Sequence, residues 1–166
     1  GTEEVCQTKV DVLVSTLGKS FGVNGGYVVS SAKIIDYLTE TAPLYIFSNP
    51  ITAAEAAAAL KAVEIVDSDE GVESLKNLQR LSKRLRDGLT KIGLETLQGE
   101  HPIIPILIRD TERTSALVKH LFANAILATG LNFPVVPKGE QEIRLQVSAS
   151  HTEKDIDYLL QVLREF

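Results

Sequence analysis

A nearly continuous apolar run near the start of the chain limits the folds that are open to it. Residues Val10 to Ser15 read Val-Asp-Val-Leu-Val-Ser and are rich in β-branched side chains. Such a run is typical of a strand that is covered on both faces in a parallel sheet. Because a covered parallel strand needs helices on both sides, the run predicts an α/β protein.

Further α/β elements follow this run. A glycine-containing loop at residues 21–26 precedes a second short strand at residues 27–29, and residues 32–38 carry apolar side chains at helical spacing. Asn49-Pro50 is a helix-start signal, with Asn as the N-cap and Pro at the first helical position. We therefore expect an alanine-rich helix from Ile51 to Val66.

A long amphipathic helix is the clearest element of the sequence. We expect it to begin near residues 68–70 and to stop at Gly93, because glycine commonly follows the last helical turn. One face carries apolar residues at spacings of three and four, namely Leu75, Leu78, Leu81, Leu85, Leu89 and Ile92. The change of pattern predicts a boundary between a sheet-and-helix part, residues 1–68, and a compact α+β part, residues 69–166.

The second part continues with alternating strands and helices. The expected elements are a strand at residues 103–108, a helix at 114–125, strand-like pieces at 135–136 and 143–147, and a last helix from 152 to 163. Pro105 suits an edge strand or a bulge, since proline cannot donate to a sheet ladder. Gly130 is expected to end the helix before it, and the segment Thr152 to Asp155 resembles a capping box.

Composition excludes several classes of function. The 17 Lys and Arg residues are scattered among 22 Asp and Glu residues, with a net charge of −5, whereas a nucleic-acid surface needs a concentrated basic patch. No apolar run approaches the roughly 20 residues that cross a bilayer, and the start has no signal-peptide pattern. Cys6 has no second thiol, and neither His101 nor His151 has a partner at catalytic or metal-binding spacing. The sequence therefore predicts a soluble cytoplasmic protein with a small-molecule or protein partner and no metal.

The segment Ser15-Thr16-Leu17-Gly18-Lys19 lies where the first strand ends, which is where ligands gather in open α/β sheets. Hydroxyls and backbone N–H groups can hold a phosphate, and a lysine amine can attack an aldehyde. The combination suits pyridoxal phosphate (PLP), although on spacing alone an ordinary surface loop stays equally open.

The same lysine also belongs to Gly18-Lys19-Ser20, the tail of a P-loop. A P-loop requires a glycine five positions before the Gly-Lys pair, and Leu13 stands there. The chain after Ser20 runs into a glycine-rich loop, where a P-loop would open a helix. Nucleotide hydrolysis is therefore disfavoured.

Three separated segments resemble the α-oxoamine synthases, which are fold-type-I PLP enzymes. They are Val10 to Lys19 with Gly25-Gly26-Tyr27, Tyr45 to Asn49, and Phe133 to Gly139 with Ile143 to Thr152. The resemblance is collinear over essentially the whole chain. It implies that residues 1–68 are the carboxy-terminal part of the PLP-binding large domain and that residues 69–166 are the small α+β carboxy-terminal domain.

The resemblance also implies roles for four residues. Lys19 would hold the PLP and later move protons at the substrate α-carbon, and Thr16 would hydrogen-bond the cofactor phosphate. Ser48 would reach the phosphate bound by the other subunit of a homodimer, helped by the helix expected directly after it. Arg144 would bind the carboxylate of the amino-acid substrate.

Each of the last three roles has a simpler explanation. Thr16 can cap a turn, Ser48 can be a helix-start hydroxyl, and Arg144 can pair with Glu142 or Glu140. Taken singly, these explanations are the stronger ones. The collinear motifs are what favour the family roles.

The implied reaction is the transfer of an acyl group from an acyl-CoA to an amino acid. The motifs look most like the glycine C-acetyltransferase branch, which uses glycine and acetyl-CoA, while the 8-amino-7-oxononanoate synthase branch stays open. The family's amino-terminal segment, which holds the cofactor ring, is not in this sequence, and the chain has no methionine. We therefore expect a fragment that is inactive alone, or that serves only as a folding or dimerisation domain.

Overall fold

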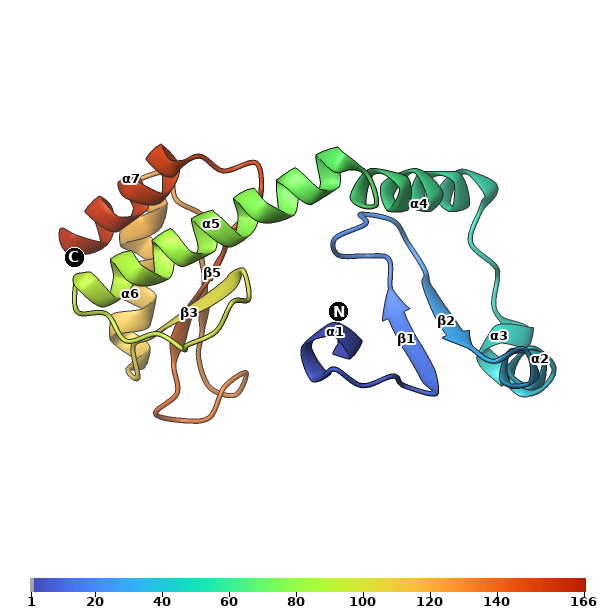
Figure 1. The fold of residues 1–166 in the computed structure, drawn as a ribbon. Coiled ribbons are helices and arrows are strands. Elements are labelled where there is room, and N and C mark those ends of the chain that lie inside the picture. Colours follow the sequence, from blue (N-terminus) through green and yellow to red (C-terminus); the bar gives the residue numbers. More distant parts are fainter. Residues whose placement is uncertain (1) are drawn as a thin grey trace. The chain divides into compact units, whose positions relative to one another are not determined.

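The computed structural model describes residues 2–166. The chain divides into two compact units, one up to Ser68 and the other from Asp69 to Phe166 (Figure 1). Each unit has its own sheet and its own helices. The two are therefore described separately.

The first unit pairs a two-stranded sheet with four helices. Its elements are α1 (Thr2–Cys6), β1 (Val12–Thr16), β2 (Gly26–Ser30), α2 (Ala32–Thr41), α3 (Pro43–Phe47) and α4 (Ala53–Val66). Strands β1 and β2 pair antiparallel, with Val12 opposite Ser30 and Thr16 opposite Gly26 (Figure 1). The predicted second strand and the helix after it are confirmed.

A parallel partner for β1 is not found within residues 2–166. Its partner β2 is antiparallel, because the connection at residues 17–25 is too short for the crossover that a parallel pair needs. The strand is also not covered, since Val14 is 69% exposed. The apolar side chains of β1 require cover from other elements, and residues 2–68 do not provide that cover.

The predicted start of the alanine-rich helix is wrong. Helix α4 begins at Ala53, and its N-cap is Thr52 instead of Asn49. The Thr52 hydroxyl accepts from the Glu55 N–H at 3.2 Å, and the Glu55 carboxylate accepts from the Thr52 N–H at 2.7 Å. This capping box satisfies two backbone donors at once, and it therefore prevails over the single Asn-Pro signal.

The second unit is a three-stranded antiparallel sheet with three helices. Its elements are α5 (Asp69–Lys91), β3 (Ile103–Leu107), α6 (Thr111–Ala123), β4 (Thr129–Leu131), β5 (Glu142–Gln146) and α7 (Glu153–Arg164). The strand order is β3-β5-β4, so β3 is an edge strand, as Pro105 predicted. The long helix and the strand around Ile143 are likewise confirmed.

One hydrophobic core holds the second unit together. It contains Leu81, Leu85 and Leu89 of α5, together with side chains of β3, β5, α6 and α7. Alternate residues of β5, such as Ile143, point into this core, whereas Arg144 points to the opposite face. The amphipathic face of α5 behaves as predicted from Leu81 onward, but Leu75 is half exposed.

Two predictions in the second unit are wrong. Helix α6 ends at Ala123 with Asn124 as its C-cap, and Gly130 belongs to β4. A side chain at Gly130 would lie 2.7 Å from Val118, so close packing explains the glycine. The segment around Val135 is a turn closed by the Val135 N–H on the Asn132 carbonyl, 2.8 Å apart, and it is not a strand.

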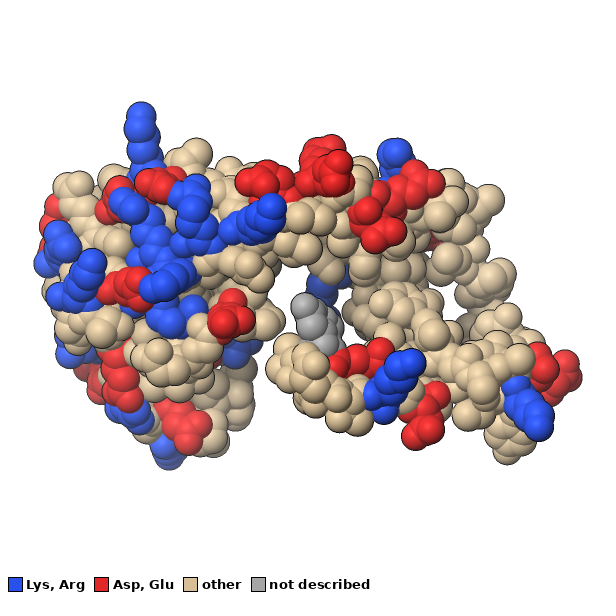
Figure 2. Space-filling view, viewed as in Figure 1, with Lys and Arg blue, Asp and Glu red and all other residues tan. Residues whose placement is uncertain are grey.

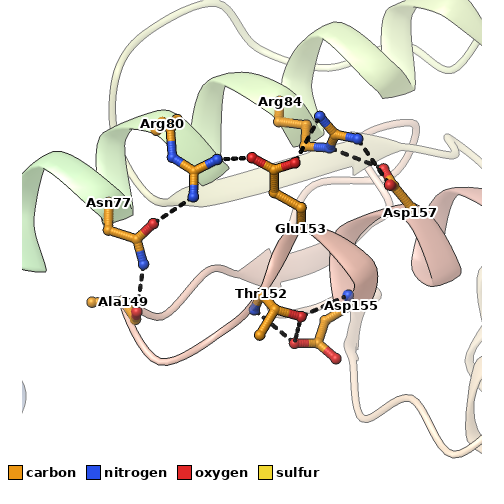
Figure 3. Close-up of polar contacts among 8 residues, drawn as sticks. All are labelled: Asn77, Arg80, Arg84, Ala149, Thr152, Glu153, Asp155 and Asp157. Carbon is orange, nitrogen blue, oxygen red and sulfur yellow. Dashed lines mark hydrogen bonds and ion pairs between the residues drawn. The ribbon is translucent and has the colours of Figure 1, made fainter.

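Polar contacts join α5 to α7 (Figure 3). Arg84 donates to both carboxylate oxygens of Asp157, at 2.9 and 2.8 Å, and Arg80 pairs with Glu153. Thr152 caps α7 in the predicted capping box with Asp155. These contacts fix the segment that leaves β5 against α5.

Candidate functional site

The loop of residues 17–25, which carries Lys19, is closed by backbone hydrogen bonds. The Leu17 N–H donates to the Gly25 carbonyl at 2.9 Å, and the Val23 N–H donates to the Leu17 carbonyl at 3.0 Å. The Leu17 side chain is buried. Lys19 lies in the turn, where its carbonyl accepts from the Gly22 N–H at 3.1 Å. The backbone of the lysine is thus fixed.

The side chain of Lys19 is available to a ligand. It is exposed, and within residues 2–166 its amine makes no hydrogen bond or ion pair. Thr16 ends β1 at the entrance to the loop, and its hydroxyl is also exposed. The structure therefore brings these two predicted site residues together on one short segment.

The loop is fastened to the segment that leads into α4. Gly25 adopts φ +102°, and a side chain there would lie 2.6 Å from Ile51 Cγ2, so only glycine fits. The Thr52 backbone and hydroxyl lower the pKa of Glu55, and a hydrogen bond from Asn24 of the loop lowers it further. The lysine loop and the start of α4 hence form one piece.

Ser48 does not lie where the sequence placed it. It is the C-cap of the short helix α3, it is exposed, and the next helix begins only after Thr52. In the first turn of α4, the Glu55 N–H donates to the Thr52 hydroxyl. Residues 49–52 thus separate Ser48 from the first turn of α4, and no hydrogen bond within residues 2–166 joins Ser48 to Thr16 or Lys19.

A hollow of about 670 Å³ lies beside Thr16 in the first unit. Strands β1 and β2 form one wall, and residues of α2 and α3 form the other. Its lining is mostly apolar and includes Tyr27 and Tyr45, which we did not predict as site residues. Both tyrosines belong to the segments that resemble the α-oxoamine synthases, and this resemblance could have pointed to them.

Arg144 lies in the second unit, on the central strand β5. Its side chain is half exposed, and Nη2 donates to Glu142 Oε1 at 3.1 Å. Both residues line a hollow of about 430 Å³ together with Arg86 and His101. The pairing of Arg144 with Glu142 is thus observed, whereas a pairing with Glu140 is not.

Arg86 holds one wall of this second hollow. Its guanidinium is almost fully buried and donates to the carbonyls of Leu97 and His101, each at 3.1 Å. His101 Nδ1 in turn accepts from the Ile103 N–H at 3.1 Å. His101 thus holds the backbone close to it, and so does His151, whose Nδ1 accepts from the Ser148 N–H.

Basic side chains gather over α5 (Figure 2). Lys76, Arg80, Lys83 and Arg84 each pair with a carboxylate. This face is therefore charge-compensated and does not form a basic patch. Among residues 2–166, no helix has both the length and the apolar character that crossing a membrane requires.

Comparison with known proteins places these elements in a family. Residues 4–163 match the aminotransferase class I and II family. An 8-amino-7-oxononanoate synthase of Thermosipho melanesiensis is 37% identical over 92% of this chain. A 2-amino-3-ketobutyrate coenzyme A ligase of Escherichia coli is 33% identical over 94% of it. The chain spans 39% of the length of each of these two relatives.

Solved structures show the same fold. A structure of the serine palmitoyltransferase SPT with PLP superposes with a TM-score of 0.88, over 94% of this chain and 39% of that one, at 22% identity. The predicted α/β fold class is confirmed by this likeness. The resemblance to the α-oxoamine synthases is confirmed by the two curated relatives.

Proposed function

Because the chain belongs to the aminotransferase class I and II family, we propose that its parent protein is a PLP-dependent acyltransferase that joins an acyl-CoA to an amino acid. The observation that carries this proposal is the exposed amine of Lys19 on a backbone-closed loop directly after β1. A fixed backbone with a reachable amine is what covalent attachment of an aldehyde cofactor needs.

The residues around Lys19 suit PLP. The amine is the group that binds the aldehyde, and the Thr16 hydroxyl at the same end of β1 is a donor for the phosphate. An electron sink at the amino-acid α-carbon is the chemistry that PLP supplies when bound. Lys19 then has a second task, which is to take and return the proton at that carbon.

Arg144 would hold the carboxylate of the amino acid. Its guanidinium is planar, always charged and half exposed on the outer face of β5, and these properties suit two parallel hydrogen bonds to a carboxylate. Ser48 would contact the cofactor phosphate of a second subunit, which makes the protein a homodimer. The family resemblance alone supports this role of Ser48.

The bonds of the reaction balance as follows. A C–C bond forms between the amino-acid α-carbon and the acyl carbonyl carbon, the thioester C–S bond breaks, and CoA leaves as the thiol. The α-carbon loses either a proton or its carboxyl group, which leaves as carbon dioxide. With glycine and acetyl-CoA, and loss of the proton, the product is 2-amino-3-ketobutyrate.

We propose glycine and acetyl-CoA as the substrates, with an 8-amino-7-oxononanoate synthase activity as the second candidate. The motif at residues 133–139 favours the first. The identity of 37% to an 8-amino-7-oxononanoate synthase, against 33% to the ligase, favours the second. We further propose that residues 1–68 end the PLP-binding large domain, that residues 69–166 are the small domain, and that the protein is cytoplasmic.

The first experiment tests Lys19. The chain is incubated with PLP, reduced with borohydride and mapped by peptide mass spectrometry. We expect the label at Lys19 in clear excess over Lys9 and Lys33, which are exposed lysines of the same unit. Equal labelling of the three would contradict a prepared site in this chain, and the chain would then be a folding or dimerisation domain.

The second experiment tests the substrates on the full-length parent enzyme. Release of the CoA thiol is measured with glycine, alanine and serine, each against acetyl-CoA and a longer acyl-CoA. Thiol release with glycine and acetyl-CoA alone supports the first candidate. A preference for alanine and the longer acyl-CoA supports the second, and no thiol release with any pair contradicts acyl transfer.

A further inference from the structure

Glu142 and Arg144 share the outer face of β5, since residues two apart in a strand point the same way. They form an ion pair with Nη2 and Oε1 3.1 Å apart. The Glu142 side chain is only 13% exposed, whereas that of Arg144 is 49% exposed. The carboxylate is thus held inside while the guanidinium reaches toward solvent.

Arg86 lines the same hollow as Glu142, but it donates to the carbonyls of Leu97 and His101 instead. Leu107 of β3 and Leu131 of β4 stand directly opposite it on the two neighbouring strands. Among residues 2–166, Arg144 is the side chain that hydrogen-bonds the Glu142 carboxylate. A mostly buried carboxylate between apolar neighbours needs a compensating cation, so the ion pair of Glu142 with Arg144 is strongly favoured.

We propose that Glu142 competes with the substrate carboxylate for Arg144 and thereby sets both the affinity and the specificity of this site. The proposal rests on the assignment of Arg144 under the proposed function. An arginine binds a carboxylate best through two adjacent N–H groups, and Nη2 is already engaged by Glu142. The incoming carboxylate must share that group and lies beside a like charge.

This competition predicts which ligands the site prefers. Both negative charges of a dicarboxylate would lie near Glu142, so Glu142 repels it more strongly than it repels a monocarboxylate. The site therefore selects amino acids with one carboxylate. Glu142 is a specificity-determining residue, although it does not touch the reacting atoms.

The test uses the chemical reactivity of Arg144 and does not need catalysis. Phenylglyoxal, an arginine reagent, is applied to the chain at increasing acetate concentration, and modification of Arg144 is counted by peptide mass mapping. We expect the half-protecting acetate concentration to fall roughly 1.5- to fivefold in Glu142→Gln, the size of effect typical of one such ion pair. The fall should be larger for malonate than for acetate.

Two further variants keep the test decisive. Glu140→Gln removes an exposed carboxylate that does not pair with Arg144, and it should behave like the unchanged chain. Glu142→Leu places an apolar side chain between Leu107 and Leu131 and serves if the Gln variant does not fold.

Equal protection of the unchanged chain and of the Glu142 variants would overturn the proposal. So would a lack of acetate protection in all of them, because Glu142 would then have nothing to compete with. Neither result bears on the PLP labelling of Lys19, which does not involve Arg144. Failure of the competition is thus distinguishable from failure of the proposed cofactor site.

Discussion

The second unit carries its own core, and the first does not. Leu81, Leu89, Ile104 and Ile106 of the second unit are completely buried. In the described part of the first unit, the buried apolar side chains are Leu17 and Ala59 alone. Leu44 and Phe47, by contrast, are 85% and 86% exposed in the same unit.

The difference shows that local signals and core burial are separate requirements. The first unit has well-defined strands, turns and a capped helix, all specified within a few residues of each other. Its apolar side chains find no cover among residues 2–68. The proposed cofactor residues lie in this uncovered unit, while Arg144 lies in the second unit, which has its own hydrophobic core.

The largest test of this contrast is the truncation of one apolar side chain in each unit. Leu85→Ala empties a buried position of α5 and should lower the free energy of unfolding of the second unit by about 2–5 kcal/mol. Val14→Ala, on the exposed face of β1, should cost less than about 1 kcal/mol. Native-state hydrogen exchange measures both units separately.

Leu75→Ala is the matched control within α5, since Leu75 is half exposed on the same helix. It should change stability by less than about 1 kcal/mol. If Val14→Ala destabilised its unit as much as Leu85→Ala does, the first unit would have a core of its own and the comparison would fail.

The sequence predicted the second unit better because its signals are local and redundant. The leucines of α5 repeat over about four turns, and Thr152 with Asp155 forms a complete capping box. One prediction from a single residue failed in this unit. Gly130 looked like a helix end, yet it is a glycine because Val118 packs against its backbone, and that contact depends on tertiary structure.

In the first unit the differences from prediction concern pairing and capping. The apolar run of β1 carries no information on the direction of its partner, which the short connection at residues 17–25 decides. The capping box of Thr52 and Glu55, and not Asn49-Pro50, sets the start of α4. This pattern was present in the sequence. Placing Ser48 beside a helix start followed from taking Asn49-Pro50 as that start.

The site was predictable only in part for the same reason. Thr16 and Lys19 are close in sequence, so their neighbourhood follows from the chain itself. The contact of Gly25 with Ile51 and the burial of Glu142 beside Arg144 depend on segments that meet only in the folded chain. No spacing rule in the sequence gives either contact.

A smaller effect is expected from removing the same type of cap in each unit. Thr52 caps α4 and Thr152 caps α7, both through capping boxes. Thr152→Ala should cost about 1 kcal/mol of global stability in the second unit, because α7 packs on its core. Thr52→Ala should raise exchange only at the first turn of α4.

Site-resolved hydrogen exchange of the two variants distinguishes global from local loss. Serine at each position is the control, because it keeps the hydroxyl that accepts the hydrogen bond. A global loss of protection in the first unit on Thr52→Ala would show that α4 is cooperative with the strands, and that the first unit resembles the second in this respect.

The smallest expected effect is a difference in acid sensitivity. The Arg84 hydrogen bonds lower the pKa of Asp157, and the Thr152 backbone and hydroxyl lower that of Asp155. A carboxyl with a lowered folded pKa binds protons more weakly than in the unfolded chain. Its stabilisation is therefore complete above the ordinary range near about 4 and is lost as the pH falls through the lowered value.

The melting temperature of the second unit should thus fall between about pH 5 and pH 2, and Asp157→Asn should flatten that dependence. Glu112→Gln removes an exposed carboxylate outside the α5–α7 contacts and should leave the slope unchanged.

In the first unit, protonation of Glu55 at low pH should weaken the capping box and fray the first turn of α4 only. No core couples that helix end to the rest of the unit. The slopes will be shallow because these groups are exposed and screened by solvent. An equal global response of both units to acid would mean that the capping contacts of the first unit are as cooperative as those of the second.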